Sequence, residues 1–465
     1  MSHSENPTAL SSREDALRIF KAGVTAADPY QAVKSCLFTD GQQLEFLLDL
    51  NDLTKKRTGH WSKVHLIAFG KAACAMAKAA QEIIPAHLLA AGSLAVTNYE
   101  NVTTLDAIEV IGAAHPLPDE AGLNAALKCA ALISLAQVNE LVLVLVSGGG
   151  SALIPCPTHG VSLAEKIATT ELLLASGATI NQINCVRKHL SLLKGGGLAR
   201  LAVPADLHAL ILSDVLGDDL SAIASGPTVA DPSTYNDAIA VFKSKNNWDK
   251  VPIKVQQHLE QGRLGKAPET PKPCDPVFKN TGHTLVGSNA ISVKATLKAA
   301  QDLGYQTRLY DAHLCGEARQ AAEKWVSYAK NLIANGIDKP LALLAGGETT
   351  VTLKGTGRGG RNQEMVLAFA IAAEQQGLTG HWTFLSGGTD GRDGPTDAAG
   401  GIADQDTLKR MSHAGINPLA MLDNNDSHTA LKSSQDLLNT GATGTNVADL
   451  QVLLIHPKLT QIHTS

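Results

Sequence analysis

Short runs rich in apolar residues alternate with amphipathic segments along the chain. The runs at 64–69, 141–146 and 208–212 resemble strands of a parallel sheet, and 141–146 is apolar at every position, as expected of a strand buried on both faces. Helical patterns fall between and before these runs, at 12–22, 71–84, 120–136, 163–175 and 184–201. This alternation predicts an α/β protein with a doubly wound parallel sheet.

The alternation is interrupted between Lys243 and Asn280. The interruption contains Asn246-Asn247 and then a group of prolines, Pro268, Pro271, Pro273 and Pro276. Such a stretch is typical of a domain boundary. A second series of strands follows, near 284–286, 306–310, 341–344, 383–385 and 450–454. The sequence therefore predicts an N-terminal domain over 1–245, a linker region over 246–280 and a C-terminal α/β domain over 281–465.

Composition narrows the class of protein. The 39 basic and 44 acidic residues give a net charge of −5. The chain therefore lacks the excess of positive charge that binding to nucleic acid or an anionic membrane would favour. The seven cysteines are scattered without a C-x-x-C pair, which favours a reducing compartment over disulfides or structural zinc. The N-terminus is polar, and the apolar runs are too short to span a bilayer. We expect a soluble, cytoplasmic protein.

Glycine-rich loops follow two strands of the first half, where open α/β sheets bind their ligands. Phe69-Gly70-Lys71 follows the first strand, and the second is followed by five small residues, Ser147, Gly148, Gly149, Gly150 and Ser151. Successive glycines let backbone N–H groups approach an anion closely. Tight turns without a ligand would use the same residues, so that alternative stays open.

A third loop in the first half is acidic. It contains Asp214, Asp218 and Asp219, whose carboxylates repel one another unless they are solvated or share a cation. Mg²⁺ would use one or two of them together with substrate phosphates. The alternative is a set of solvated acids that cap the following helix.

A fourth loop, in the second half, combines glycines with arginines. Gly347 and Glu348 end a strand, and the G-x-G-x-x-G spacing of 355–360 leads through Arg358 and Arg361 into a helix. The match to a dinucleotide fingerprint is weak, because it comes late in the chain and is flanked by an expected β-hairpin. The arginine forks suit phosphate or carboxylate. The alternative is a pair of surface arginines bonded to Glu348 and Glu364.

A fifth loop, 386–397, carries Asp390, Asp393 and Asp397 without EF-hand spacing. These acids could hold Mg²⁺ or orient a hydroxyl, or they could only stabilise a long loop. His115 follows a strand and could face a cleft, although a lone histidine is more often structural. The chain contains no P-loop, no G-x-S-x-G and no H-E-x-x-H motif.

Taken in order, five segments resemble the class II glycerate 2-kinase family, also called the MOFRL family: FGKAA at 69–73, SGGGSAL at 147–153, SDVLGDDLSAIASGPT at 213–228, GGETTVTLKGTGRGGRNQE at 346–364 and SGGTDGRDGPTDAAGG at 386–401. The resemblance implies a Rossmann-like first domain, a second α/β domain and an active site in a cleft between them. It also implies transfer of the ATP γ-phosphoryl group to the 2-hydroxyl of D-glycerate, with ATP and Mg²⁺ required.

The resemblance also implies roles for particular residues. The family's essential lysine and arginine match Lys71 and Arg361, and Asp214 or Asp390 could accept the hydroxyl proton. The expected cofactor-binding residues are Ser147, Gly148, Gly149, Gly150, Ser151, Asp218 and Asp219. The expected substrate-binding residues are Gly347, Glu348, Arg358, Asn362, Asp390 and Asp393. The expected metal ligands are Asp218 and Asp390.

Two other functions remain open at this stage. One is an NAD(P)H-dependent hydroxypyruvate reductase, because some relatives carry that label. The other is a non-catalytic sugar-phosphate sensor, because glycine loops alone would suit binding without catalysis. The expected partners are the small molecules D-glycerate and ATP, without nucleic acid or membrane, and a homodimer is an open alternative.

Overall fold

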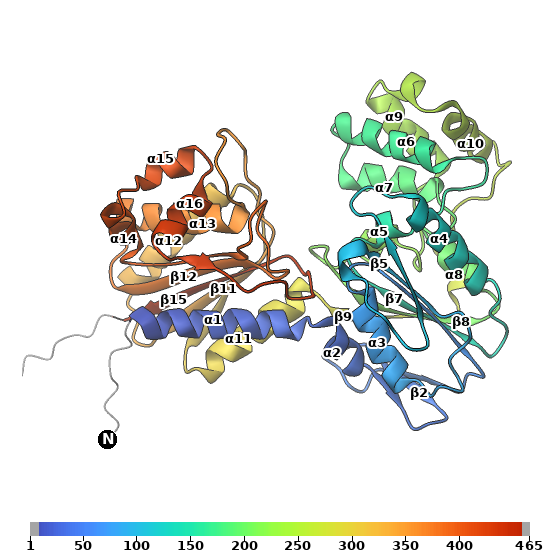
Figure 1. The fold of residues 1–465 in the computed structure, drawn as a ribbon, viewed down its shortest axis with the longest axis horizontal. Helices are drawn as coiled ribbons and strands as arrows, with labels where there is room; N and C mark the ends of the chain where they lie inside the picture. Colours follow the sequence, from blue (N-terminus) through green and yellow to red (C-terminus); the bar gives the residue numbers. More distant parts are fainter. Residues whose placement is uncertain (1–8, 458–465) are drawn as a thin grey trace, which may run out of the picture. The chain divides into compact units, whose positions relative to one another are not determined.

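The protein folds into two compact units in a computed structural model that describes residues 9–457 (Figure 1). The Rossmann-like unit comprises Pro29–Val286. The second unit combines α1 (Ala9–Ala26) with the chain from Gly287 onward. None of the described helices is long and apolar enough to cross a membrane.

The Rossmann-like unit is built on a six-stranded sheet. In spatial order its strands are β6 (Glu109–Ala113), β5 (Leu94–Asn98), β4 (Val64–Phe69), β7 (Leu141–Val146), β8 (Asp206–Leu212) and β9 (Thr281–Gly287). The neighbouring pairs from β6 to β8 are parallel. This order is that of the dinucleotide-binding fold, in which the chain changes direction between its first and fourth strands. The predicted doubly wound, Rossmann-like sheet is confirmed.

The apolar run 141–146 forms the strand β7, and every one of its residues is buried. Its register pairs Val146 with Phe69 of β4 on one side and with Ile211 of β8 on the other. The carboxyl ends of these three strands therefore lie at the same edge of the sheet. The loops that begin at Gly70, Ser147 and Ser213 start side by side.

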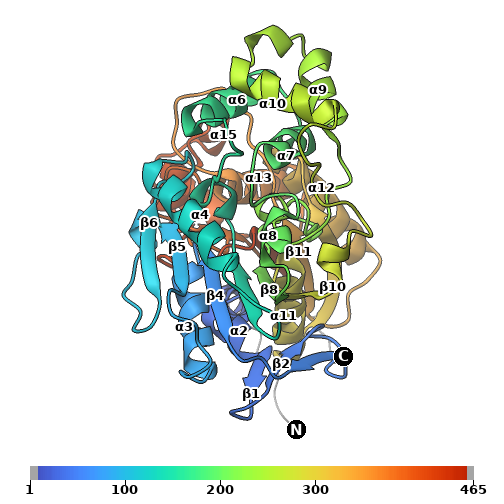
Figure 2. The same ribbon diagram turned by 90° about the vertical axis from the view of Figure 1, so that its right-hand side faces the viewer.

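Helices cover both faces of this sheet (Figures 1 and 2). On one face, α4 (Glu120–Ile133) and α8 (Gly197–Ala202) pack together, and on the other lies α3 (Ala73–Ile83). A separate helical cluster has its own apolar core and consists of α6 (Leu163–Ala175), α7 (Ile180–His189), α9 (Tyr235–Ser244) and α10 (Ile253–Arg263). The unit also contains α2 (Pro29–Lys34), α5 (Gly150–Leu153) and a small antiparallel sheet of β1 (Leu37–Thr39), β2 (Leu44–Leu47) and β3 (Lys56–Gly59).

The second unit has a mixed six-stranded sheet. In spatial order its strands are β10 (Gln306–Leu314), β11 (Leu341–Gly347), β15 (Asp449–His456), β12 (His381–Gly388), β13 (Gly400–Asp404) and β14 (Leu437–Leu438). β10 and β11 are parallel, whereas β15 runs antiparallel to both of its neighbours. Alternate residues of β15 enter different cores, with Val452 and Leu454 on one face and Leu453 and Ile455 on the other.

Helices on both faces complete the second unit. α1 and α11 (Asn289–Asp302) pack on one face, and α12 (Ala318–Ala334) and α13 (Arg361–Gln375) on the other. The residues of α13 from Asn362 to Ala373 are all buried, because α12, α15 (Pro418–Asp423) and α16 (Ser427–Ser433) also cover it. The remaining helix is α14 (Thr407–His413).

The observed units differ from the predicted boundaries at two places. α1 packs in the second unit, where Phe20 joins the core beneath β12 and β15. Residues 246–280, predicted as a linker region, belong to the Rossmann-like unit and include α10. His189 holds this segment, since its Nε2 lies 2.9 Å from Oε1 of Glu269.

Two local predictions are also corrected. The helix predicted over 184–201 is divided into α7 and α8, because Gly195 and Gly196 adopt left-handed backbone angles with φ of 55° and 81°. No strand forms between residues 351 and 360, so the hairpin expected around the G-x-G-x-x-G spacing is absent from the structure.

Candidate functional site

Lys71 lies where β4 ends, at the point where the strand order changes direction. Its backbone N–H donates to the carbonyl oxygen of Gly148 at 2.9 Å, so the loops after β4 and β7 are bonded to each other. Its own carbonyl oxygen accepts hydrogen bonds from Thr97 Oγ1 at 3.3 Å and Asn101 Nδ2 at 3.0 Å. The main chain of Lys71 is thus fixed from both sides, while its side chain is only half-buried.

Glycine is required where these two loops touch. Gly70 has a φ of 121°, and a Cβ there would lie 2.4 Å from the carbonyl oxygen of Ser147. The hydroxyl oxygen of Ser147 also accepts a hydrogen bond from the backbone N–H of Ala72 at 3.0 Å. Any larger side chain at position 70 would push the loops apart and displace Lys71.

The glycines at 148 and 149 leave room for three titratable side chains. A Cβ on Gly148 would meet Oδ2 of Asp214 at 2.4 Å. A Cβ on Gly149 would meet the ring of His115 at 3.0 Å and Cγ of Lys71 at 3.3 Å. The loop therefore brings Lys71, Asp214 and His115 around one short stretch of backbone.

The electrostatics of this cluster reflect burial and the lysine charge. Burial raises the pKa of Asp214, while the positive charge of Lys71 acts in the opposite direction. Burial also lowers the pKa of His115, and Lys71 lowers it further. A half-buried carboxylate with a raised pKa next to a cation has the properties of a general base that works near neutral pH.

The other predicted acids of this unit lie on the exposed part of the third loop. Asp218 is half-buried in a turn with a φ of 55°, and Asp219 is exposed. Oδ1 of Asp219 accepts a hydrogen bond from the backbone N–H of Ser221 at 2.8 Å within the loop, and no described side chain caps the short helix that follows at Ile223–Ser225. Neither carboxylate forms an ion pair with a described residue.

Arg361 begins α13 and is bonded to carboxylates of its own unit. Nε donates to Oδ2 of Asp449 at 2.6 Å, and Nη2 donates to Oδ1 at 2.9 Å. Nη1 lies 3.0 Å from Oε1 of Glu348, which is one of the two partners expected if the arginine were structural. The other expected partner, Glu364, instead accepts a hydrogen bond from Arg319 at 2.7 Å.

Asn362 and Asp393 form a buried network at the start of α13. The carboxylate of Asp393 accepts hydrogen bonds from the backbone N–H groups of Asn362 at 3.1 Å and Gln363 at 2.8 Å. Burial raises the pKa of Asp393 to about 6, although these N–H bonds act in the opposite direction. Asn362 in turn accepts a hydrogen bond from Ser386 Oγ at 2.6 Å. Both residues are buried and bonded, which argues for positioning α13 rather than contacting a substrate.

The G-x-G-x-x-G segment, residues 355–360, packs closely against other residues of the second unit. A Cβ on Gly355 or Gly357 would lie 2.3 Å or 2.5 Å from the carbonyl oxygen of Asn424, and one on Gly360 would meet Asp393 at 2.3 Å. These glycines allow the segment to lie close to neighbouring chain, so their spacing does not form a cradle for a dinucleotide.

Other predicted substrate residues also surround α13 and the end of β11. Arg358 is exposed, and its Nε donates to the carbonyl oxygen of Pro395 at 3.2 Å. Gly347 is needed where β11 meets β10, since a Cβ there would lie 2.1 Å from the carbonyl oxygen of Leu314. Asp390 is half-buried, and its Oδ1 accepts a hydrogen bond from the backbone N–H of Arg392 at 2.9 Å.

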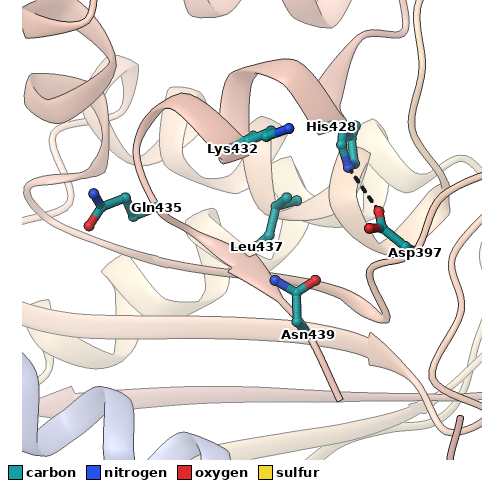
Figure 3. Close-up of a pocket in the computed structure, with 6 residues that line it drawn as sticks. All are labelled: Asp397, His428, Lys432, Gln435, Leu437 and Asn439. Carbon is teal, nitrogen blue, oxygen red and sulfur yellow. Dashed lines mark ion pairs between the residues drawn. The ribbon is translucent and has the colours of Figure 1, made fainter. Parts of the chain in front are cut away.

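The third acid of this loop, Asp397, lines a pocket of about 320 Å³ in the second unit (Figure 3). Figure 3 shows Asp397 and His428 pointing toward one another, and Oδ1 lies 3.5 Å from Nε2. The pocket is also lined by Lys432, Gln435, Leu437 and Asn439. Apart from Asp397, which the sequence offered as one possible Mg²⁺ ligand, the pocket includes no residue predicted to contact substrate or cofactor.

Comparisons with known proteins agree with the two-unit organisation. A family model described as a domain of unknown function (DUF4147) matches residues 15–260, and the MOFRL family model matches residues 341–449. The chain is 40% identical to a glycerate 2-kinase of Pyrococcus horikoshii over 453 residues, which cover 97% of this chain and 99% of that protein. The chain belongs to the class II glycerate 2-kinase family.

Further members of the family extend this comparison. A D-glycerate 2-kinase of Thermotoga maritima is 41% identical over 95% of this chain and 97% of its own length. A protein of Agrobacterium vitis labelled hydroxypyruvate reductase is 40% identical over 96% of this chain and 95% of its own length. Crystal structures of a Pyrococcus horikoshii protein and of the Thermotoga maritima glycerate kinase each have a TM-score of 0.84, cover 96% of this chain and nearly all of their own, and are 39% and 40% identical.

Each unit thus gathers its own predicted residues. The Rossmann-like unit brings Lys71, Asp214 and the loop 147–151 together, and the second unit places Glu348 against Arg361. The partner of Arg361 in β15, Asp449, was not predicted, because it lies 88 residues later and begins a largely apolar strand. His115, treated as a lone histidine in the sequence, lies against the Gly149 loop.

Proposed function

We propose that this protein is a D-glycerate 2-kinase, which transfers the γ-phosphoryl group of ATP to the 2-hydroxyl of D-glycerate. The observation that carries the proposal is the position of Lys71. It lies at the switch point of a Rossmann-like sheet, held against a glycine loop and beside the half-buried Asp214. Similarity to two glycerate 2-kinases over nearly the whole chain supports the same activity.

Lys71 and the glycine loop suit the charge of a transferring phosphoryl group. Phosphoryl transfer depends mainly on positioning and on neutralising negative charge, and the ammonium group of a lysine is a compact point charge for phosphate. The backbone N–H groups of 147–151 would add donors for the phosphate oxygens. Asp214 would accept the proton of the attacking hydroxyl, because its raised pKa brings it closer to neutral pH.

Arg361 would supply the second cation. Two of its five N–H donors bond to Asp449, and Nη1 forms an ion pair with Glu348, which leaves donors for a carboxylate or phosphate oxygen. Asp449 and Glu348 hold the guanidinium in one orientation, so the ligand meets a fixed fork. Arg361 and Lys71 belong to different units, and the proposal assigns both cations to the same reaction.

The acidic loops fit Mg²⁺, which the proposed reaction uses to neutralise the phosphates of ATP. Mg²⁺ takes oxygen ligands and binds through one or two carboxylates with phosphates and water. Asp218 and Asp390 offer such oxygens, since both are half-buried and neither forms an ion pair with a described residue. We propose Asp218 and Asp390 as the residues that hold the ion.

A reductase is the second candidate because of the label on the Agrobacterium vitis relative. The geometry supports it less well. The loop after β4 lacks the repeated glycines of a dinucleotide fingerprint, and the glycines of 355–360 are occupied by packing against Asn424 and Asp393.

The cell compartment follows from the same proposal. All seven cysteines are free, which suits a reducing compartment, and we place the enzyme in the cytoplasm. Light scattering on the purified protein would decide whether the homodimer left open by the sequence forms.

The proposal is tested by measuring ADP release and NADH oxidation on the same preparation. We expect ADP to form only when D-glycerate, ATP and Mg²⁺ are all present. We also expect ATP with Mg²⁺, and not NADH, to raise the melting temperature. NADH oxidation with hydroxypyruvate and no release of ADP would contradict the proposal.

A further inference from the structure

A pocket of about 250 Å³ in the Rossmann-like unit contains three cationic side chains from separate elements. Lys166 comes from α6, Arg187 from α7, and Lys194 from the loop before α8. Lys166 and Lys194 are only 6% and 2% exposed. The pocket also reaches Ser151, the last residue of the glycine loop.

The two lysines are held in place by neutral oxygen atoms. Lys194 Nζ donates to the carbonyl oxygen of Ser151 at 2.8 Å and contacts its hydroxyl oxygen at 3.0 Å. Lys166 Nζ donates to the carbonyl oxygen of Pro155. Among residues 9–457, no carboxylate forms an ion pair with Lys166, Arg187 or Lys194. One carboxylate, that of the exposed Glu171, also lines the pocket.

Three cations without a paired anion are unfavourable in a buried place. Burial lowers the pKa of Lys166 to about 7, with the charge of Arg187 acting in the same direction and the nearby Cys156 opposing it. Burial likewise lowers the pKa of Lys194, and Lys166 and Arg187 lower it further. A bound polyanion would offset this repulsion and keep both lysines protonated.

The remaining lining indicates which anion fits. Pro116, Leu117, Pro118, Ile167 and Leu174 provide apolar walls, and Leu117 and Leu174 are 57% and 58% exposed at the rim. D-glycerate and its phosphate have no apolar part to place there. A nucleotide combines several negative charges with a flat, largely apolar base.

We propose that this pocket binds the phosphate groups of the nucleotide through Lys166, Arg187 and Lys194, with the base against Leu117 and Leu174. The inference rests on the proposed kinase function and adds a nucleotide site to it. Lys194 and Ser151 connect this pocket to the loop that holds Lys71, so the bound phosphates would extend toward the transfer site.

Arg187→Gln is the most direct test. No described residue forms a hydrogen bond or ion pair with the Arg187 guanidinium, so we expect the variant to fold. We expect this substitution to weaken binding of the ATP analogue AMP-PNP with Mg²⁺ by ~10-fold or more, as for one lost charged contact. Lys194→Met should have a similar effect, and Leu174→Ala should weaken binding of AMP-PNP a few-fold. Isothermal titration calorimetry gives each affinity, and circular dichroism with melting curves shows which variants are folded.

Arg263→Gln is the matched control, because Arg263 is exposed on α10 and, among the residues that the structure describes, pairs only with Glu260 one turn away. It should bind AMP-PNP like the wild type. Unchanged AMP-PNP affinity in folded Arg187→Gln would overturn the inference. A variant that binds AMP-PNP normally but loses affinity for 2-phosphoglycerate would also overturn it. In both cases ADP release by the wild type would leave the proposed kinase function standing. A wild-type protein that neither binds AMP-PNP nor releases ADP would contradict both.

Discussion

Replacing Arg361 by lysine should separate the structural role of this side chain from its role in the reaction. The guanidinium donates to both oxygens of Asp449, at 2.6 Å and 2.9 Å, and its Nη1 forms an ion pair with Glu348 at 3.0 Å. Lysine keeps the positive charge but cannot form the same planar, two-bond contact. The substitution therefore weakens the contact with Asp449 and removes the guanidinium donors that remain for a ligand.

The size of each effect follows from the surroundings. Asp449 is completely buried, so one weakened hydrogen bond to its charge should lower the free energy of unfolding by about 1.5–3 kcal/mol. If the remaining donors contact the transferring group, kcat should also fall by ~10²-fold or more. A rise in KM with kcat unchanged would instead place the arginine on the carboxylate of glycerate.

Arg410→Lys provides a matched control in the same unit. Arg410 donates to both oxygens of Asp404, at 3.0 Å and 3.2 Å, and its side chain is 35% exposed, compared with 32% for Arg361. Calorimetry should show similar destabilisation for the two variants, whereas steady-state kinetics should show a loss of activity only for Arg361→Lys. If both variants keep wild-type kcat and KM per folded molecule, Arg361 has no part in the reaction.

Three further substitutions test other parts of the account. Lys71→Ala should reduce kcat by ~10²-fold in steady-state assays with little change in melting temperature, and an active but unstable variant would make Lys71 structural. Burial disfavours the charged form of His189, but its bonds to the Cys185 carbonyl and to Glu269 raise its pKa to about 9. The folded protein therefore binds this proton more tightly than the unfolded chain. The protonated histidine should contribute about 3 kcal/mol to the free energy of unfolding below pH 6.5, and this contribution should be lost as the pH rises through 9. Urea titrations of His189→Gln should lack this dependence, and an identical pH profile in the variant would refute the assignment. Gly357→Ala should destabilise the protein by about 1–3 kcal/mol, since the new Cβ meets backbone, without changing NADH or ATP affinity.

The sequence predicted those features that depend on local pattern. The run 141–146 indicated a central strand because only a strand buried on both faces is apolar at every position. The glycines at 70, 148 and 149 indicated loops that approach other groups closely, and the structure shows those groups to be Ser147, Asp214 and His115. Local composition could show that a close approach occurs, although it could not name the partner.

Features that depend on distant contacts could not be predicted in this way. The amphipathic pattern of α1 indicated a helix. The helix belongs to the second unit because Phe20 packs against strands that lie more than 350 residues later in the chain. The prolines between 268 and 276 interrupt local structure, yet the contact between His189 and Glu269 holds that segment in the Rossmann-like unit. The pairing of Arg361 with Asp449 is a long-range contact of the same kind.

The central claim concerns the reaction, and product identification tests it most directly. The wild-type protein would be incubated with D-glycerate, ATP and Mg²⁺, and the products resolved by ³¹P nuclear magnetic resonance. The account predicts 2-phosphoglycerate and ADP in equal amounts. Formation of 3-phosphoglycerate alone would contradict the assigned hydroxyl, and unchanged ATP with active reduction of hydroxypyruvate by NADH would contradict the kinase itself.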